Sequence, residues 1–250
     1  MRTIANPVAG TEVRVKPVED PGITVNGVPA TLDAVSKADV RVDIVGETRS
    51  FVVEHALGAL GLCGITAADV TGIRSEWDFA RPEHRFCYSA EMGPRNVVGH
   101  PEGLPNPALA EALGNVEVLA TEPTTRATVT EPVSLSNDHG SITIAPRELG
   151  AGIRFSVRYG DSTFECEVDP AGENDPDLIE SVTTSTTPYL SPSEEEAVVH
   201  SIADLVSDIA VIGGFDDLAV DADLGGEYHT LTVGVARAAR DRDLTVERQA

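Results

Sequence analysis

The chain has 250 residues, 41% of them hydrophobic, which argues against a disordered chain and suffices for one large domain or two smaller ones. Asp and Glu total 41 against 18 Lys and Arg, so the formal net charge is −23. This charge argues against nucleic acid as a partner, because a phosphate backbone requires a basic surface. Only Lys16 and Lys37 are lysines. Acid-rich, lysine-poor chains are typical of cells that hold molar salt, and an acidic protein from an ordinary cytoplasm is the alternative.

Membrane insertion is not expected from this sequence. The most apolar stretch, residues 51–65, is interrupted by two polar residues and is too short to span a bilayer. The N-terminal MRTIANPVAG lacks the apolar core of a signal peptide. Cys63, Cys87 and Cys166 are widely spaced, which is typical of free thiols in a reducing compartment. We therefore expect a cytoplasmic protein.

Short alternating runs predict strands over residues 12–44, among them TEVRVKPV and PGITVNGVPATL with Asn26-Gly27 as a hairpin turn. Ser50 can cap a helix over residues 51–62, which Gly64 can end. Residues 78–107 lack periodicity and are rich in Pro, Gly and Arg. They read as a long loop.

The second half of the chain repeats this order of strands followed by helices. The polar stretch of residues 120–132 reads as a linker. Strands are predicted in GSITIAP, GIRFSVRY and STFECEV, and a loop in EVDPAGENDPD. The run Ser191-Pro192-Ser193-Glu194 predicts the start of a helix that continues to about Ile212 before Gly213-Gly214. A last helix is predicted from about Gly226 to the basic run at residues 237–242.

Two of the predicted helices share a sequence pattern. VVEHALGALGLCGI contains His55 and AVVHSIADLVSDIAVIG contains His200, each early in an apolar helix. Self-similarity of this kind indicates a duplicated unit. We expect an α+β fold of two similar domains, residues 1–122 and 128–250, each a β-sheet packed on helices, with the active site between them.

A stripe of polar residues marks the second of these helices. His200, Asp204 and Asp208 are spaced at i, i+4 and i+8, so they lie on one face. A His and an Asp one turn apart can bind one metal ion, although alone such a pair is more often a solvated ion pair. Glu54-His55 adds a second histidine and an acid, and zinc hydrolases use three protein ligands and a nearby base. The alternative makes Glu54-His55 a surface pair at a helix N-terminus.

These runs resemble motifs of the UDP-3-O-acyl-N-acetylglucosamine deacetylases. VEHALGALGLCGI is similar to the first zinc-ligand motif of that family, and VVHSIADLVSDIAVIGG to its H-x-x-x-D-x-x-x-D helix. GGEYHTL resembles its S-G-H-A-L segment, and KPVEDPGITVNGVPATLDAV its first strands. The matches follow the family's order along the chain.

The resemblance implies a role for each matched residue. His55, His200 and Asp204 would hold Zn²⁺, and Glu54 would be the base that deprotonates the attacking water. His229 would stabilise the oxyanion or protonate the amine, and Asp208 would orient His229. Thr184 would help polarise the amide carbonyl. The implied reaction is hydrolysis of the acetamide of an N-acetylated sugar, which carries a nucleotide in the family.

Several departures from the family pattern limit what the resemblance implies. Ser201 replaces the family's lysine, and only a short loop joins Thr184 to Glu194 where the family builds an acyl-chain passage. We therefore expect a substrate without a long acyl chain. The family's E-x-P-x-x-D-G-S segment is missing. His84 and His100 stand in its place and could be ligands, although solvated loop histidines are commoner. The alternatives are another zinc amidase or deacylase for a small polar metabolite, and a non-catalytic zinc-binding relative; the oligomeric state stays open.

Overall fold

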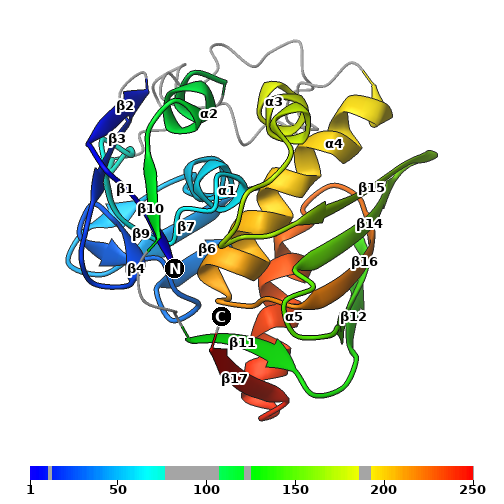
Figure 1. Cartoon of the computed structure of the whole chain (residues 1–250). Helices are drawn as coiled ribbons and strands as arrows, with labels where there is room; N and C mark the ends of the chain where they lie inside the picture. Colours follow the sequence, from blue (N-terminus) through cyan, green and yellow to red (C-terminus); the bar gives the residue numbers. More distant parts are fainter. Residues whose placement is uncertain (11–12, 77–106, 121–124, 186–192, 250) are drawn as a thin grey trace.

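The structure is a computed structural model that describes residues 1–10, 13–76, 107–120, 125–185 and 193–249. The chain forms a mixed α+β fold with β-sheets packed on helices, which confirms the predicted fold class. Figure 1 shows one large sheet on the left, the other on the right, and helices between them.

The first large sheet is built by the N-terminal half of the chain. Its strand order is β2-β3-β9-β4-β5, and β9 lies parallel to β4 and antiparallel to β3. The predicted turn at Asn26-Gly27 joins β4 to β5, and both residues have the positive φ that such a turn requires. The bounds are β2 (Val8–Gly10), β3 (Val13–Pro17), β4 (Gly22–Val25), β5 (Val28–Pro29) and β9 (Ala67–Thr71).

The second large sheet repeats this arrangement in the C-terminal half. Its order is β12-β13-β16-β14-β15, and β16 lies parallel to β14 and antiparallel to β13. The three strands predicted here coincide with β13, β14 and β15. The bounds are β12 (Val133–Asn137), β13 (Gly140–Pro146), β14 (Ile153–Tyr159), β15 (Ser162–Val168) and β16 (Leu218–Leu224).

The repetition extends beyond the two sheets. Each half opens with a strand that pairs antiparallel with the last strand of the same half: β1 (Arg2–Ile4) with β10 (Val118–Ala120), and β11 (Thr125–Val129) with β17 (Thr245–Gln249). In each half a helix precedes the central strand and another follows it. This shared topology supports the duplicated unit that the two histidine helices suggested.

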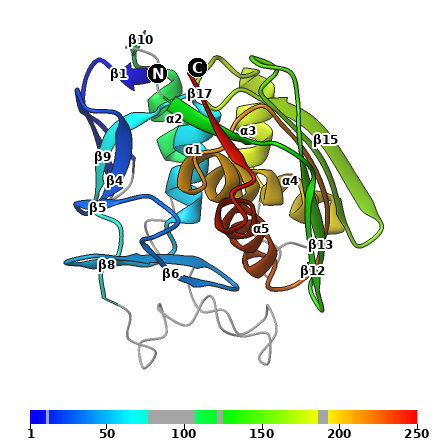
Figure 2. The ribbon, with the colours of Figure 1, turned by 90° about the horizontal axis from the view of Figure 1, so that it is seen from below.

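The helices lie between the sheets, where Figure 2 shows α1, α4 and α5 side by side. α1 packs on α4 and on η4, the π-helix that continues α4. α5 packs on β12, β13 and η4. α3 packs between α2 and α4. The bounds are α1 (Glu54–Leu62), α2 (Pro107–Gly114), α3 (Pro176–Thr184), α4 (Glu194–Leu205), η4 (Val206–Ile212) and α5 (His229–Asp241).

Two glycines let α1 approach α4 and η4 closely. A Cβ atom at Gly58 would overlap the carbonyl oxygen of Ala203, and one at Gly61 would lie 2.5 Å from a methyl carbon of Val206. Both glycines lie on the same face of α1, one turn apart. The side chains that α1 carries are therefore held against those of α4.

A small three-stranded sheet is inserted before α1. It consists of β6 (Val35–Ala38), β7 (Val42–Val45) and β8 (Arg49–Ser50), in that order. Figure 2 shows it below the first large sheet and near α5. Arg237 of α5 donates to the carbonyl oxygens of Leu32 and Val35, so the insertion is tied to the C-terminal half.

Some predicted boundaries were wrong. α1 begins at Glu54 rather than residue 51, and Ser50 lies in β8, so Ser50 does not cap the helix. The cap of α4 is Ser193, whose hydroxyl accepts from the N–H of Glu196, so this helix begins at Glu194. α5 begins three residues later than predicted.

Two segments that were predicted to lack regular structure contain elements. Residues 125–129 of the predicted linker form β11, because β17 supplies its backbone partners. α3 follows the predicted loop and was not foreseen. Asp175 caps it through the N–H of Asp177, and Pro176 occupies its first position. The predicted loop of residues 78–107, apart from Pro107 in α2, lies outside the described residues, as do His84, Cys87 and His100.

Candidate functional site

A strained turn presents Glu54 and His55 at the start of α1. Val52 has a φ of +58°, a conformation that a β-branched residue rarely adopts. Its N–H donates to Oδ1 of Asp43 at 3.3 Å, and Asp43 also forms a buried ion pair with Arg41 at 2.6 Å. This pair holds the turn, which ends the preceding strand and starts the helix at Glu54.

The second part of the site comes from α4 and η4. His200, Asp204 and Asp208 are all buried, which contradicts the reading of a solvated stripe. The helix changes from α to π geometry at Val206, between Asp204 and Asp208. Single π turns inside helices are frequent at functional sites. The sequence did not predict this change.

The predicted metal ligands converge between the two halves of the chain. One ligand-type atom from each of His55, His200 and Asp204 lies within 4.8 Å of the others. The His55 and His200 rings meet edge to face with their centroids 5.0 Å apart. Nε2 of His200 lies 3.6 Å from Oδ2 of Asp204. His55 is contributed by α1 and the other two by α4, so close packing of these helices forms the cluster.

Hydrogen bonding prepares this cluster for a cation. Nδ1 of His200 lies 3.0 Å from the carbonyl oxygen of Ser185, an acceptor that favours the tautomer with its proton on Nδ1. Among the residues that the structure describes, Nε2 of His200 and Oδ1 of Asp204 find no hydrogen-bond partner although both are buried, a state that is costly without compensation. Two imidazoles and a carboxylate suit Zn²⁺. The residues present therefore fit a metal ion.

His229 and Asp208 form a second pair beside the cluster. Nδ1 of His229 lies 2.7 Å from Oδ2 of Asp208, and the other ring nitrogen lies 3.8 Å from Oδ2 of Asp204. Burial lowers the pKa of His229, but the carboxylates of Asp208, Asp204 and Glu54 outweigh it and raise this pKa to about 10. The imidazole therefore carries a proton near neutral pH. The predicted orientation of His229 by Asp208 matches this hydrogen bond.

The Glu54 carboxylate is buried next to the cluster. Its Oε2 accepts from the backbone N–H of Val42 on β7 at 2.9 Å. Burial raises the pKa of Glu54 to about 8, against the opposing attraction of His229. The pKa of Asp204 is lowered, because the neighbouring histidines, first His200 and then His229 and His55, outweigh the effect of burial. The pKa values of Glu54 and Asp204, the two carboxylates described here, are thus shifted in opposite directions.

The Thr184 hydroxyl bonds within its own helix and not to the ligand group of His55, His200 and Asp204. The side chain is exposed at the end of α3, and its Oγ1 donates to the carbonyl oxygen of Glu180 at 2.7 Å. The adjacent residue, Ser185, is the one that contacts His200. The role of Thr184 stays a prediction. The short connection after it, residues 186–192, lies outside the described residues.

Two hydroxyl groups of this site were missed by the sequence reasoning. Tyr228 donates to Oδ2 of Asp204, and Thr232 donates to Oδ2 of Asp208 at 2.5 Å. Tyr228 and Thr232 are one helical turn apart at the start of α5, as Asp204 and Asp208 are along α4 and η4. The two hydroxyl residues and the two acids are each four residues apart, and this equal spacing was a signal in the sequence for the two contacts.

No helix in the described part of the chain is both long and apolar enough to cross a membrane. Comparison of the chain with protein-family models and with curated proteins finds no match. Function is therefore inferred from the site itself.

Proposed function

We propose that this protein is a zinc-dependent amide hydrolase, similar to the UDP-3-O-acyl-N-acetylglucosamine deacetylases, that removes the acetyl group from an N-acetylated sugar. The observation that carries the proposal is the group of His55, His200 and Asp204, in which the buried ligand-type atoms of His200 and Asp204 have no hydrogen-bond partner within the described ranges. His55, His200 and Asp204 would hold the zinc ion. When bound, zinc would supply a Lewis acid that makes water nucleophilic near neutral pH.

The remaining residues have the groups that hydrolysis of an amide requires. A cation held nearby would lower the raised pKa of Glu54, so its carboxylate would take a proton from the water that attacks the carbonyl carbon. The protonated His229, held by Asp208, would stabilise the developing oxyanion. As the C–N bond breaks, His229 or the newly protonated Glu54 would pass a proton to the nitrogen, so the products are acetate and a free amine. Zinc binding alone would require neither Glu54 nor His229, which favours an enzyme over a binding protein.

The proposal is tested with chelator-treated protein that is reloaded with zinc and assayed in molar potassium chloride. A panel of N-acetylated sugars, with and without a linked uridine diphosphate, is followed by release of acetate and of free amine. We expect equal amounts of both, loss of turnover with a chelator, and loss with His200→Ala. Zinc-loaded protein that cleaves no acetamide in the panel would instead favour another amidase or a binding role.

The same panel addresses the expected absence of an acyl-chain passage. A fatty-acyl-bearing sugar analogue should compete weakly with a simple N-acetyl sugar. Tight binding of the acylated analogue would overturn this part of the proposal while leaving the hydrolysis intact.

A further inference from the structure

The Asp204 carboxylate has a partner outside the ligand group. Its Oδ2 accepts from the hydroxyl of Tyr228, and both side chains are buried. Oδ1 of the same carboxylate has no hydrogen-bond partner in the described part of the chain. Oδ2 also lies 3.6 Å from Nε2 of His200, so Tyr228 holds the carboxylate beside the ligand histidine while Oδ1 keeps a free lone pair.

The position of Tyr228 is set by α5 and the turn before it. The residue is the N-cap of α5, and its side chain makes no capping hydrogen bond, so its hydroxyl is directed elsewhere. Gly226, two residues earlier, has a φ of +46° and lets the chain turn from β16 toward the helix. The Tyr228 ring lies beside that of His229, with centroids 5.0 Å apart. The turn thus delivers both side chains to the cluster.

We propose that Tyr228 is a positioning residue for the metal ligand Asp204: its hydroxyl holds the carboxylate in the orientation in which it can bind the ion. This inference depends on the proposed metal site. A hydrogen-bonded partner behind a metal ligand fixes the ligand's orientation, and its loss typically costs 10–100-fold in metal affinity. Removing the Tyr228 hydroxyl would leave the Asp204 carboxylate free to rotate.

The test compares Tyr228→Phe with Thr24→Val as a matched control. The Thr24 hydroxyl donates to Oδ1 of Asp69 at 2.6 Å, so Thr24→Val removes a hydroxyl that holds a carboxylate outside the ligand group. Zinc affinity is measured on the full-length apo proteins by competition with a chromophoric chelator. The visible absorption spectrum of the Co²⁺-loaded proteins reports the ligand geometry directly.

We expect Tyr228→Phe to weaken zinc binding about 10–100-fold and to change the cobalt spectrum, and Thr24→Val to do neither. Circular dichroism of the apo proteins checks that both variants are folded. If the wild type binds zinc and Tyr228→Phe binds it equally well with the same cobalt spectrum, the positioning role is wrong although the metal site stands. If the wild type binds no zinc, the metal site itself fails and the inference fails with it.

Should Tyr228→Phe not fold, the wild type still gives an answer. Metal binding within this hydrogen-bonded group should perturb the ultraviolet absorption of a tyrosine, and Thr24→Val should keep that perturbation. No tyrosine difference spectrum on saturation with zinc would contradict the contact.

Discussion

At the scale of single residues, a substitution of Glu54 distinguishes catalysis from metal binding. It adjoins the ligand His55, but its own carboxylate is bonded to the Val42 N–H. Glu54→Gln keeps an oxygen for that bond and removes the base. We expect zinc content to stay unchanged and turnover to fall by about 10²–10⁴-fold. Turnover and metal content are measured on the same preparation.

The matched control for this change is Glu19→Gln, which alters an exposed carboxylate away from the site. It should leave both quantities unchanged. Wild-type turnover by Glu54→Gln would show that another group deprotonates the water, and the mechanism implied by the resemblance would not apply.

The site residues were more predictable than the contacts that support them. His55, His200, Asp204, Asp208 and Glu54 were identifiable because their chemistry and spacing are visible in the sequence. Tyr228 and the Val52 turn were missed, because each acts through a contact with another element of the fold, Tyr228 with α4 and Val52 with β7. Sequence periodicity reports which face a residue occupies but not what lies opposite it.

At the scale of elements, the packing of α1 on α4 is the condition for the site. Gly58 lies one turn after His55 and meets the Ala203 carbonyl, one residue before Asp204. Gly58→Ala should push the helices apart, lowering the free energy of unfolding by about 1–3 kcal/mol as overpacking does. Since His55 and Asp204 would separate, zinc affinity should fall as well.

Gly114→Ala is the control for this change, since a Cβ at that end of α2 has no neighbour within 4 Å. It should be neutral or slightly stabilising. Denaturant unfolding and zinc competition measure both variants. Equal stability and affinity for Gly58→Ala and wild type would mean that the helices are not held by this close contact.

The elements themselves were partly predictable. β13, β14 and β15 alternate more buried with more exposed residues along most of their seven positions, so their pattern sufficed. β11 and the π-helix were missed because each depends on its surroundings: β11 on pairing with the distant β17, and η4 on the packing of α1. α3 is different, since its Asp175-Pro176 start was visible and was read as a loop.

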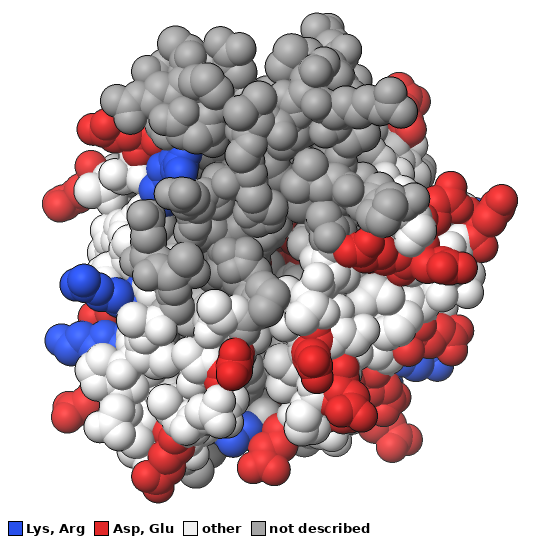
Figure 3. All heavy atoms as spheres, turned by 90° about the horizontal axis from the view of Figure 1, so that it is seen from above, with Lys and Arg blue, Asp and Glu red and all other residues white. Residues whose placement is uncertain are grey.

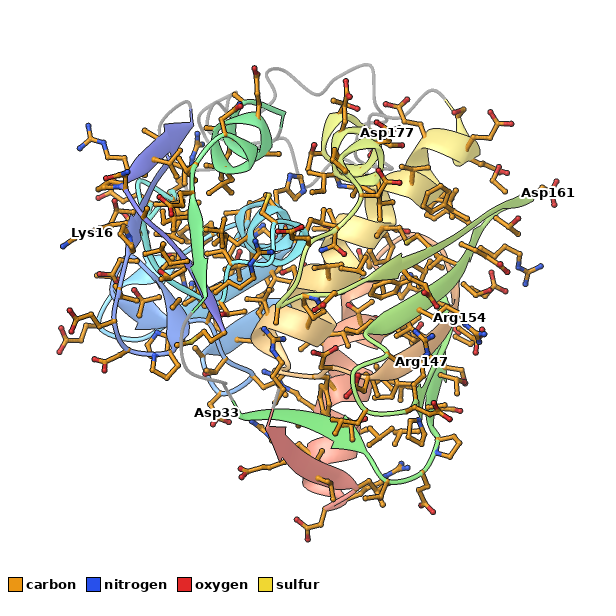
Figure 4. All side chains as sticks on the ribbon, in the orientation of Figure 1. Lys16, Asp33, Arg147, Arg154, Asp161 and Asp177 are labelled. Carbon is orange, nitrogen blue, oxygen red and sulfur yellow. The ribbon has the colours of Figure 1, made fainter. Side chains whose placement is uncertain are left out.

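At the scale of the whole molecule, the acidic charge is carried on the outside. Figure 3 shows acidic side chains outnumbering basic ones on the described part of one face. Lys16, Asp33 and Asp161, which are labelled in Figure 4, lie at the periphery of the fold. A net charge of −23 opposes a compact state through self-repulsion.

Stability should therefore depend strongly on salt. The Debye length falls to about 3 Å near 1 M, so molar potassium chloride screens most of the repulsion between exposed carboxylates. We expect a higher thermal unfolding midpoint in molar potassium chloride than in dilute buffer. Neutralising the exposed pair with Glu19→Gln and Asp20→Asn should narrow that difference slightly. Equal midpoints in the two solutions would remove the argument for a high-salt cytoplasm.

We propose that one zinc ion joins the two halves of the molecule through His55, His200 and Asp204. The most direct measurement is metal analysis of protein purified without chelator, together with His55→Ala, His200→Ala and Asp204→Ala. We expect about one zinc per wild-type chain, because the described residues contain one set of three ligands, and strong loss in each variant. Zinc content that is unchanged by all three substitutions, or absent from the wild type after zinc loading, would contradict it.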